Sequence, residues 1–220
     1  MKTAIFALFC LALPAVSFAQ IVTAEDYLKR VEDTYAGFRD YEANITIRQG
    51  NNTMAGKVSH LKPQFLRIDF SQPTNQVMVF NGEQLTVYLP DFSAILNQTV
   101  SGGRGPNMAS AAGIALLRRA YAPAYVSSPN PMPLEDSGEQ VVRLRLTPRS
   151  GGQTYKEIQL AINPQTLYVR RIEGITYSGG STRFDFTNTK VNQGIPEARF
   201  IYDSPASANV YNNFLFRDRQ

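Results

Sequence analysis

The stretch LRIDFSQPTNQVMVFNGEQLTVYLPD, residues 66–91, alternates apolar and polar side chains, turns at a proline, and alternates again. Such alternation is typical of strands that place one apolar face on a core. The turn sequences QPTN (72–75) and NGE (81–83) leave only short spacers between the runs. Because parallel pairing needs long crossovers, these short spacers predict an antiparallel meander.

The same pattern extends along most of the chain. A helix is expected over residues 23–38, where Thr23 suits the N-cap and apolar residues recur at spacings of three and four. A second, short helix rich in Ala and Leu is expected over 108–121, followed by a proline-rich, extended connection that ends near 136. Strands are predicted at 41–49, 53–61, 64–71, 75–80, 84–89, 92–100, 140–148, 154–162, 166–173 and 181–188, with a last one near 199–202.

These elements predict the mainly β, α+β class, with a single curved antiparallel sheet that one helix precedes and one helical insertion interrupts. A sheet of about ten strands tends to curl on itself. The apolar residues predicted to face its concavity include Leu66, Ile68, Phe70, Val77, Val79, Leu85, Val87, Leu144, Leu160, Phe184 and Phe186. A single sheet does not leave this much apolar surface in water, so either helices or a ligand must fill the concavity.

The first residues resemble an export signal. Lys2 precedes an apolar run too short to span a bilayer, and SFA at 17–19 suits signal peptidase. Residues 1–19 are therefore predicted to be a signal peptide and residues 20–220 the mature domain, which has no cysteine because Cys10 is discarded. An uncleaved anchor would need a longer apolar run, and a lipoprotein would need its cysteine at the cleavage point.

Composition argues against the common enzyme classes. His60 is the only histidine, lies in a strand pattern and is interpreted as a solvated strand residue; no nucleophile motif accompanies it. Metal sites built from Cys and His are excluded by count, and GGRG at 102–105 is interpreted as a hinge or linker. We therefore expect no catalytic residue, no metal site, no cofactor and no enzymatic activity, although a glycosidase carboxylate pair is not excluded. The scattered formal charge of +4 disfavours nucleic-acid binding.

The segment LKPQFLRIDFSQPTNQVMVFNGEQLTVYLPDFSAI (61–95) resembles the LolA family, periplasmic carriers that ferry lipoproteins to the outer membrane. The matching features are Lys62-Pro63, the aromatic-rich strand from Phe65 to Phe70, Pro73, the apolar strand from Val77 to Phe80, and Asn81-Gly82 followed by Leu85 and Tyr88. The tail ARFIYDSPASANV (198–210) is similar to the closing segment of the family. Three positions depart from the pattern: Lys62 replaces the usual Arg, Asn81 the usual Asp, and Val87 an aromatic residue.

The resemblance implies an unclosed β-barrel whose hydrophobic cavity, under a helical lid, binds the acyl chains of lipoproteins. It implies a periplasmic monomer that receives its cargo, acylated lipoproteins or lipid, from an inner-membrane ABC-type lipoprotein-releasing complex and passes it to an outer-membrane acceptor. In this family the basic residue before the proline latches the lid. Lys62 is thus expected to be a partly buried latch that bonds carbonyls at the C-terminal end of a lid helix, more loosely than Arg would. The alternative, a solvent-facing strand lysine with no such role, stays equally open.

Two other functions remain open at this stage. A sensor or regulator that binds lipid or lipoprotein could use the same fold, and a hydrolase could hide its carboxylates among the acidic residues. The chain has no room for a neighbouring regulatory domain, which favours the carrier over the sensor. A LolB-like receptor is disfavoured because it needs a lipidated N-terminal cysteine.

Overall fold

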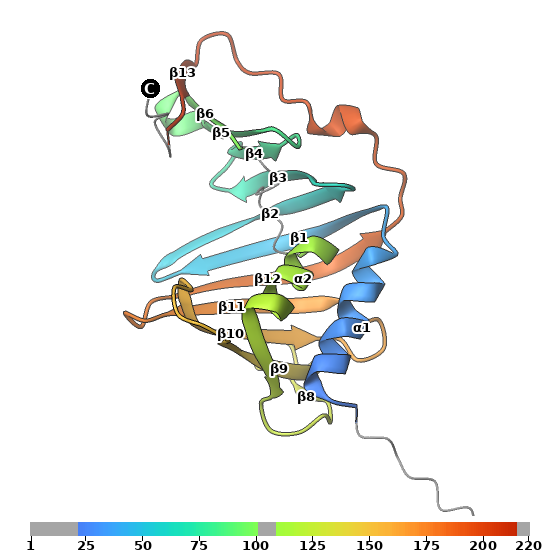
Figure 1. Ribbon diagram of the computed structural model, residues 1–220. Helices are drawn as coiled ribbons and strands as arrows, with labels where there is room; N and C mark the ends of the chain where they lie inside the picture. The colour runs from blue at the N-terminus through green and yellow to red at the C-terminus, as the bar shows by residue number, and fades with distance from the viewer. Residues whose placement is uncertain (1–21, 101–108, 215–220) are drawn as a thin grey trace, which may run out of the picture.

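The computed structural model describes residues 22–100 and 109–214, so the predicted signal peptide and the predicted hinge at 102–105 lie outside the described residues. The described chain forms one curved, unclosed sheet with two helices over one of its faces (Figure 1). No helix in the described ranges combines the length and apolar character needed to cross a bilayer. The predicted class, a mainly β fold with a single curved sheet, is confirmed.

The sheet of the described residues has 13 strands, and ten of them form two antiparallel meanders. The first contains β1 (Asp40–Gln49), β2 (Asn52–Leu61), β3 (Phe65–Gln72), β4 (Val77–Phe80), β5 (Gln84–Leu89) and β6 (Ala94–Thr99). The second contains β9 (Gln140–Pro148), β10 (Tyr155–Ile162), β11 (Val169–Thr176) and β12 (Ser181–Val191). Pairing of β1 with β12 joins the two meanders into one surface.

Three strands were not expected from the sequence. Strand β7 (Tyr121–Tyr125) pairs with β9 at one edge, and β8 (Met132–Pro133) also pairs with β9. Strand β13 (Asn209–Asn212) pairs with β6 at the opposite edge, and this pairing is parallel. The prediction of a strand near 199–202 is wrong, because the short 3-10 helix η2 (Glu197–Phe200) lies there. A second 3-10 turn, η1 (Pro90–Phe92), precedes β6.

Helix α1 (Ala24–Ala36) forms where the sequence predicts it. The Thr23 hydroxyl accepts a hydrogen bond from the backbone N–H of Asp26 at 3.1 Å, which caps the first turn. Tyr27, Leu28, Val31 and Tyr35 recur on one side of the helix and are buried. The helix ends at Gly37, and its apolar side packs on the sheet in the main hydrophobic core.

The two faces of the sheet differ in what covers them. On the face under the helices, here called the helix-covered face, Tyr41, Ile45, Ile68, Leu144 and Leu160 join α1 in the main core. On the opposite, outer face, Leu61 and Val79 pack against Phe200 of η2, within the segment that leads from β12 to β13 (Figure 1). Both faces of the first meander therefore bury apolar side chains.

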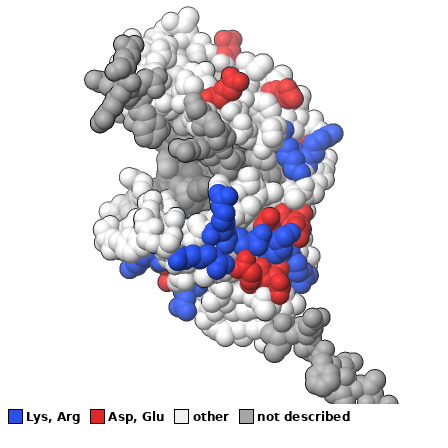
Figure 2. All heavy atoms as spheres, in the orientation of Figure 1, with Lys and Arg blue, Asp and Glu red and all other residues white. Residues whose placement is uncertain are grey.

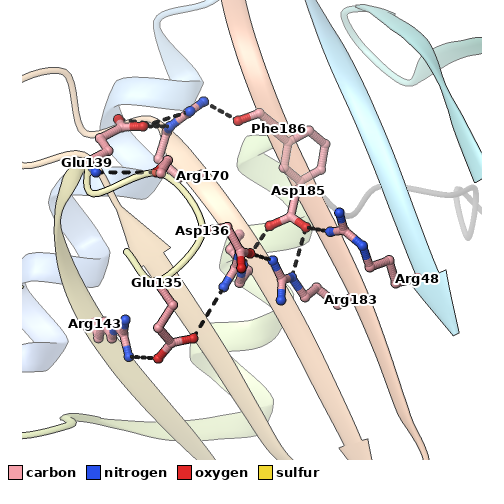
Figure 3. A network of polar contacts seen from close by, with 11 residues as sticks. Arg48, Glu135, Asp136, Glu139, Arg143, Arg170, Arg183, Asp185 and Phe186 are labelled. Carbon is pink, nitrogen blue, oxygen red and sulfur yellow. Dashed lines mark hydrogen bonds and ion pairs between the residues drawn. The ribbon is translucent and has the colours of Figure 1, made fainter. Parts of the chain in front are cut away.

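Ion pairs cover part of the outer face in the second meander. Figure 3 shows Asp185 of β12 accepting hydrogen bonds from Arg48 at 2.6 Å and Arg183 at 2.8 Å. Arg171 bonds Asp185 and also Asp136, each at 2.6 Å. Because Asp136 belongs to the loop before β9, this network fastens the loop onto strands β11 and β12. These residues stabilise the outer surface, away from the helices.

Candidate apolar ligand site

An apolar hollow of about 290 Å³ lies between helix α2 (Ala111–Ala120) and the helix-covered face of the sheet. We call it the α2 hollow. The helix contributes Gly113, Leu116 and Leu117, and the sheet contributes Tyr155, Ile158, Ile172, Gly174 and Phe184. Tyr121, Gln153 and Thr154 complete the lining. Its volume is at the lower end of the range for small-molecule sites, and its walls are mostly aliphatic or aromatic.

Helix α2, which covers the hollow, has an N-terminus that its sequence defines. The Ser110 hydroxyl accepts a hydrogen bond from the N–H of Gly113 at 3.1 Å, which caps the N-terminus. Ile114 is buried beneath the helix, whereas Leu116 is 49% exposed although it also lines the hollow. An apolar side chain half in water at the edge of an apolar space is suited to contact a hydrophobic ligand.

Ion pairs link helix α2 and the segment after β9 to α1, in addition to the packing of Ile114 in the main core. Arg118 donates to Glu32 at 2.8 Å and to Glu25 at 3.2 Å. Arg149, after β9, donates to Glu25 at 2.7 Å and to the carbonyl of Tyr121 at 3.0 Å. Figure 2 shows the resulting mixture of basic and acidic side chains over the two helices. These partly exposed pairs are individually weak, so they contribute only modestly to holding α2 in place.

The residues predicted to line the cavity divide between the two faces. Strand register places Leu66, Ile68, Phe70, Leu85, Val87, Leu144, Leu160, Phe184 and Phe186 on the helix-covered face. Of these, Phe184 lines the α2 hollow. Ile68, Phe70, Leu144, Leu160 and Phe186 are buried in the core below the helices, while Leu66 is only partly buried. Their role in binding an acyl chain stays a prediction.

The prediction that Val77 and Val79 face the concavity of the sheet is wrong. Leu66 pairs with Phe80 and Ile68 with Met78, so Val77 and Val79 point to the outer face. There Val79 packs with Leu61 and Phe200. The run VMVF (77–80) is apolar at every position, so alternation could not reveal which pair of side chains faces inward.

Lys62 lies between β2 and β3, at the C-terminal end of α1. Its ammonium donates a hydrogen bond to the backbone carbonyl of Ala36, the last residue of that helix. A cation is favoured there because the helix dipole is negative at its C-terminus. The side chain is exposed, so the expectation that it would be partly buried is wrong. The role of this contact as a latch stays a prediction.

His60 is not the solvated residue expected from the sequence. It is 6% exposed and stacks on Tyr41, with ring centroids 5.2 Å apart and planes at 13°. The two residues are opposite each other across β1 and β2, so they share the helix-covered face. Burial, and secondly the charge of Lys62, lowers the pKa of His60 to about 4, which keeps the imidazole neutral at neutral pH.

Several residues of the α2 hollow were missed. Leu116 and Leu117 lie three and four residues after Gly113, a helical spacing that marks the face of α2 turned to the hollow. Gly174 interrupts an apolar strand, and such a glycine often marks a place where another group approaches closely. A Cβ atom on Gly174 would lie 2.7 Å from the ring of Tyr155. The sequence contains these local signals, but it does not indicate which strands α2 covers.

A curved, unclosed sheet with helices over an apolar hollow defines a class of protein that encloses hydrophobic ligands. The sequence profile of the family described as "Outer membrane lipoprotein carrier protein LolA" matches residues 46–203, and the chain belongs to this family. The fold is thus a lipoprotein-binding one. A relative from Bordetella avium (strain 197N), an outer-membrane lipoprotein carrier protein, is 26% identical over 208 residues, covering 93% of each chain.

Solved structures show the same fold at lower identity. An uncharacterized conserved protein from Thermus thermophilus matches with a TM-score of 0.57 and 15% identity, over 86% of this chain and 98% of the other. The structure of the MucA/MucB complex of Pseudomonas aeruginosa matches with a TM-score of 0.52 and 15% identity, over 86% of this chain and 63% of that one. At these identities the likeness is one of fold alone.

Proposed function

We propose that this protein is a periplasmic carrier that encloses the acyl chains of lipoproteins and transfers them from the inner to the outer membrane. The observation that carries the proposal is the α2 hollow, an apolar space that α2 covers and that Leu116 leaves partly open to solvent. Membership of the LolA family supports the same reading. No catalytic step is part of this function.

The energetics of an acyl chain explain why a carrier needs such a site. Each buried CH₂ group contributes about 0.8 kcal/mol, so acyl chains hold a lipoprotein to its membrane. A carrier must replace most of this burial with its own apolar surface, and it must release the chains again. The apolar sheet face below α2 supports the first requirement, and the partly exposed ion pairs of α2 support the second. An ABC-type releasing complex would supply the cargo, and an outer-membrane acceptor would take it.

The direct test is recovery of the cargo. We expect the protein isolated from the periplasm to co-elute with acylated protein, identified by mass spectrometry of the intact complex. Recovery of phospholipid without acylated protein would contradict lipoprotein transport and favour a lipid-binding role. An empty protein that also fails to bind a synthetic diacylated peptide would overturn the proposal.

A matched pair of variants locates the site. Leu116→Glu places a charge at the rim of the α2 hollow, on a residue that is already 49% exposed, so folding should be unaffected. Val210→Glu places the same charge on β13, at a residue that is 54% exposed on the opposite edge of the sheet. We expect Leu116→Glu alone to weaken binding of a diacylated peptide, by about tenfold, because it puts a carboxylate against the acyl chain. Equal affinities would show that the chain binds elsewhere.

A further inference from the structure

The two edge strands of the sheet differ in how they meet solvent. Strand β7 forms one edge and contains Pro123, which has no N–H to offer to a further strand. Strand β13 forms the other edge, and its sequence, NVYN (209–212), has neither a proline nor a charge. No described strand pairs with its second side, so within the described ranges β13 is an edge that lacks these two common safeguards against pairing.

The backbone of β13 presents hydrogen-bonding groups to this free side. The N–H groups of Asn209 and Asn213 donate to carbonyls of the segment that contains β6, each at 2.8 Å. Successive N–H groups of an extended strand point to opposite sides, so those of Val210 and Asn212 point away from β6. Both residues are exposed. A further strand can therefore pair here while the ladder between β13 and β6 stays intact.

Apolar side chains continue up to this edge on both faces of the sheet. On the outer face, strand register places Tyr88, Ile95 and Val210 in one row across β5, β6 and β13. On the helix-covered face, Leu96 is paired with Tyr211 in the same way. Ile95 is buried, whereas Val210 is 54% exposed and Tyr211 53% exposed, at the last described strand. An added strand with apolar residues would bury both of these side chains.

Two exposed phenylalanines flank β13. Phe92 lies in η1, beside the start of β13, and Phe214 follows its end. With Val210 and Tyr211, they are four of the eight large apolar side chains that are exposed in the described ranges. Exposed apolar side chains gathered at one place are typical of an interaction surface, and a free strand beside them is typical of recognition by strand addition.

The charge of this edge distinguishes between possible partners. Residues 77–100 and 201–214, which include β4, β5, β6 and β13, contain Glu83, Asp91 and Asp203 but no Lys or Arg, although the whole chain has a formal charge of +4. A second copy of the chain would bring the same three carboxylates to the interface, and like charges repel each other. Anionic lipid is disfavoured for the same reason. A basic segment is attracted.

We propose that the free side of β13 is a docking site for a partner protein, which adds an extended segment to the sheet as a further strand. The segment that fits has two or three consecutive apolar residues, which cover Val210 and Tyr211, and Lys or Arg on either side of them. Backbone pairing supplies affinity, and the side chains supply specificity. Strands β6 to β1 separate this site from the α2 hollow along the sheet, so the two sites can be tested separately.

A library of short random peptides displayed on yeast tests the docking site. The wild-type protein is the bait, and Val210→Pro is used for comparison. Proline removes the outward N–H of residue 210 but none of the hydrogen bonds that β13 donates to β6, so the edge should still form. We expect selected peptides to have an apolar centre and basic ends, and to bind Val210→Pro about tenfold more weakly. No enriched peptide, or equal binding to both proteins, would overturn the proposal.

Hydrogen exchange followed by NMR gives a second readout, which needs no variant. A selected peptide should slow exchange of the Val210 and Asn212 amides and change that of Asn209 little, since Asn209 already bonds to the β6 segment. Protection confined to other parts of the sheet would overturn the proposal. This measurement decides the matter even if Val210→Pro does not fold.

Charge separates the proposed partner from the alternatives. Asp91→Asn should weaken binding of a selected basic peptide by up to about fivefold, and high salt should weaken it in the wild type as well. Selection of acidic peptides would contradict a basic partner. A wild-type dimer that Val210→Pro dissociates would assign the edge to a second copy, and binding to phosphatidylglycerol vesicles that Val210→Pro loses would assign it to a membrane; either result would overturn the proposal.

Binding of a diacylated peptide keeps this proposal apart from the proposed function. Val210→Pro should bind the diacylated peptide as the wild type does, and Leu116→Glu should bind the selected basic peptide as the wild type does. Loss of diacylated-peptide binding from the wild type would overturn the carrier function alone. Loss of basic-peptide binding in Leu116→Glu would place the docking site at the α2 hollow and overturn its assignment to β13.

Discussion

Lys62 connects the turn between β2 and β3 with the end of α1, through its hydrogen bond to the carbonyl of Ala36. A cation at an exposed helix C-terminus contributes about 0.3–1 kcal/mol, which corresponds to a change of roughly two- to fivefold in an opening equilibrium. The contact is thus strong enough to bias the position of α1 and weak enough to break during the proposed loading of cargo.

The first prediction follows from this contact. Lys62→Leu should leave the protein folded and should speed entry and loss of a fluorescent fatty acid by about two- to fivefold. Stopped-flow fluorescence measures both rates. Lys57→Leu is the control, since Lys57 is exposed on β2, the strand that precedes Lys62. Rates that match the wild type in both variants would show that Lys62 is an ordinary surface charge.

Asp40 is another residue whose contacts join distant parts of the chain. It is fully buried and accepts hydrogen bonds from the backbone N–H groups of Gln193 at 2.7 Å and Gly194 at 3.1 Å. Burial disfavours its charge, but these hydrogen bonds and that from Arg39 outweigh burial and hold its pKa below 3.8. Asp40 therefore fixes the start of the segment that crosses the outer face after β12.

We expect Asp40→Asn to lower the free energy of unfolding by about 1–3 kcal/mol at pH 7, because it weakens hydrogen bonds to a buried charge. A carboxylate with a lowered pKa in the folded state stabilises the fold above its unfolded pKa, and this contribution is lost as pH falls through the folded value. The stability difference between wild type and variant should therefore stay constant above about pH 5 and shrink at lower pH.

Urea unfolding at several pH values measures this difference. Asp91→Asn is the control, since Asp91 is exposed and forms no ion pair with any residue in the described ranges. A difference that persists undiminished down to about pH 2 would contradict the assignment of a charged Asp40 in the folded protein.

At the scale of elements, close contact between β10 and β11 shapes the α2 hollow. The ring of Tyr155 lies over Gly174, where a Cβ atom would meet it at 2.7 Å. Both residues line the hollow. A side chain on Gly174 would therefore push the ring into the space that a ligand needs.

Gly174→Ala should reduce the affinity for a diacylated peptide by about fivefold or more, since overpacking commonly costs about 1 kcal/mol or more. The melting temperature should change little, because Tyr155 can move into the hollow. Gly180→Ala provides a matched control: its Cβ would meet only Thr176, at 3.4 Å. Isothermal titration calorimetry gives the affinities. An unchanged affinity for Gly174→Ala would exclude the α2 hollow as the binding space.

At the scale of elements, sequence patterns predict the orientation of some strand residues but not of others. Ile68 and Phe70 alternate with Arg67 and Asp69, so their face could be predicted. The run 77–80 is apolar throughout and gave no such contrast. Strand β13 is short and exposed along its length, and it forms because the chain crosses the outer face to reach β6, a long-range event with no local signal. The sequence around His60 likewise has no pattern that predicts its stacking on the ring of Tyr41.

At the scale of the whole molecule, the proposed carrier function requires α2 to move while the sheet stays folded. The sheet is held by long ladders of backbone hydrogen bonds and by a continuous core. Helix α2 has a buried Ile114, but its polar ties to the rest of the molecule pass largely through Arg118 and Arg149. Regions with few buried contacts open at lower free energy than the core.

The last prediction tests this difference in stability. Partly exposed ion pairs contribute about 0.2–1 kcal/mol each, so removing Arg118, which pairs with Glu25 and Glu32, should raise the open population of α2 by about two- to thirtyfold. Hydrogen exchange measured by mass spectrometry should accelerate in 111–120 of Arg118→Ala, while β1 and β12 keep the wild-type rates. Transfer of a diacylated peptide to lipid vesicles should accelerate in parallel.

Arg119→Ala is the matched control, because Arg119 is exposed on the same helix and forms no ion pair with a described residue. It should exchange and transfer as the wild type does. High salt should have the same effect on the wild type as Arg118→Ala, since it screens partly exposed pairs. If exchange instead rises equally in the sheet and in α2, the helix opens only when the whole fold does, and a separately moving cover is ruled out.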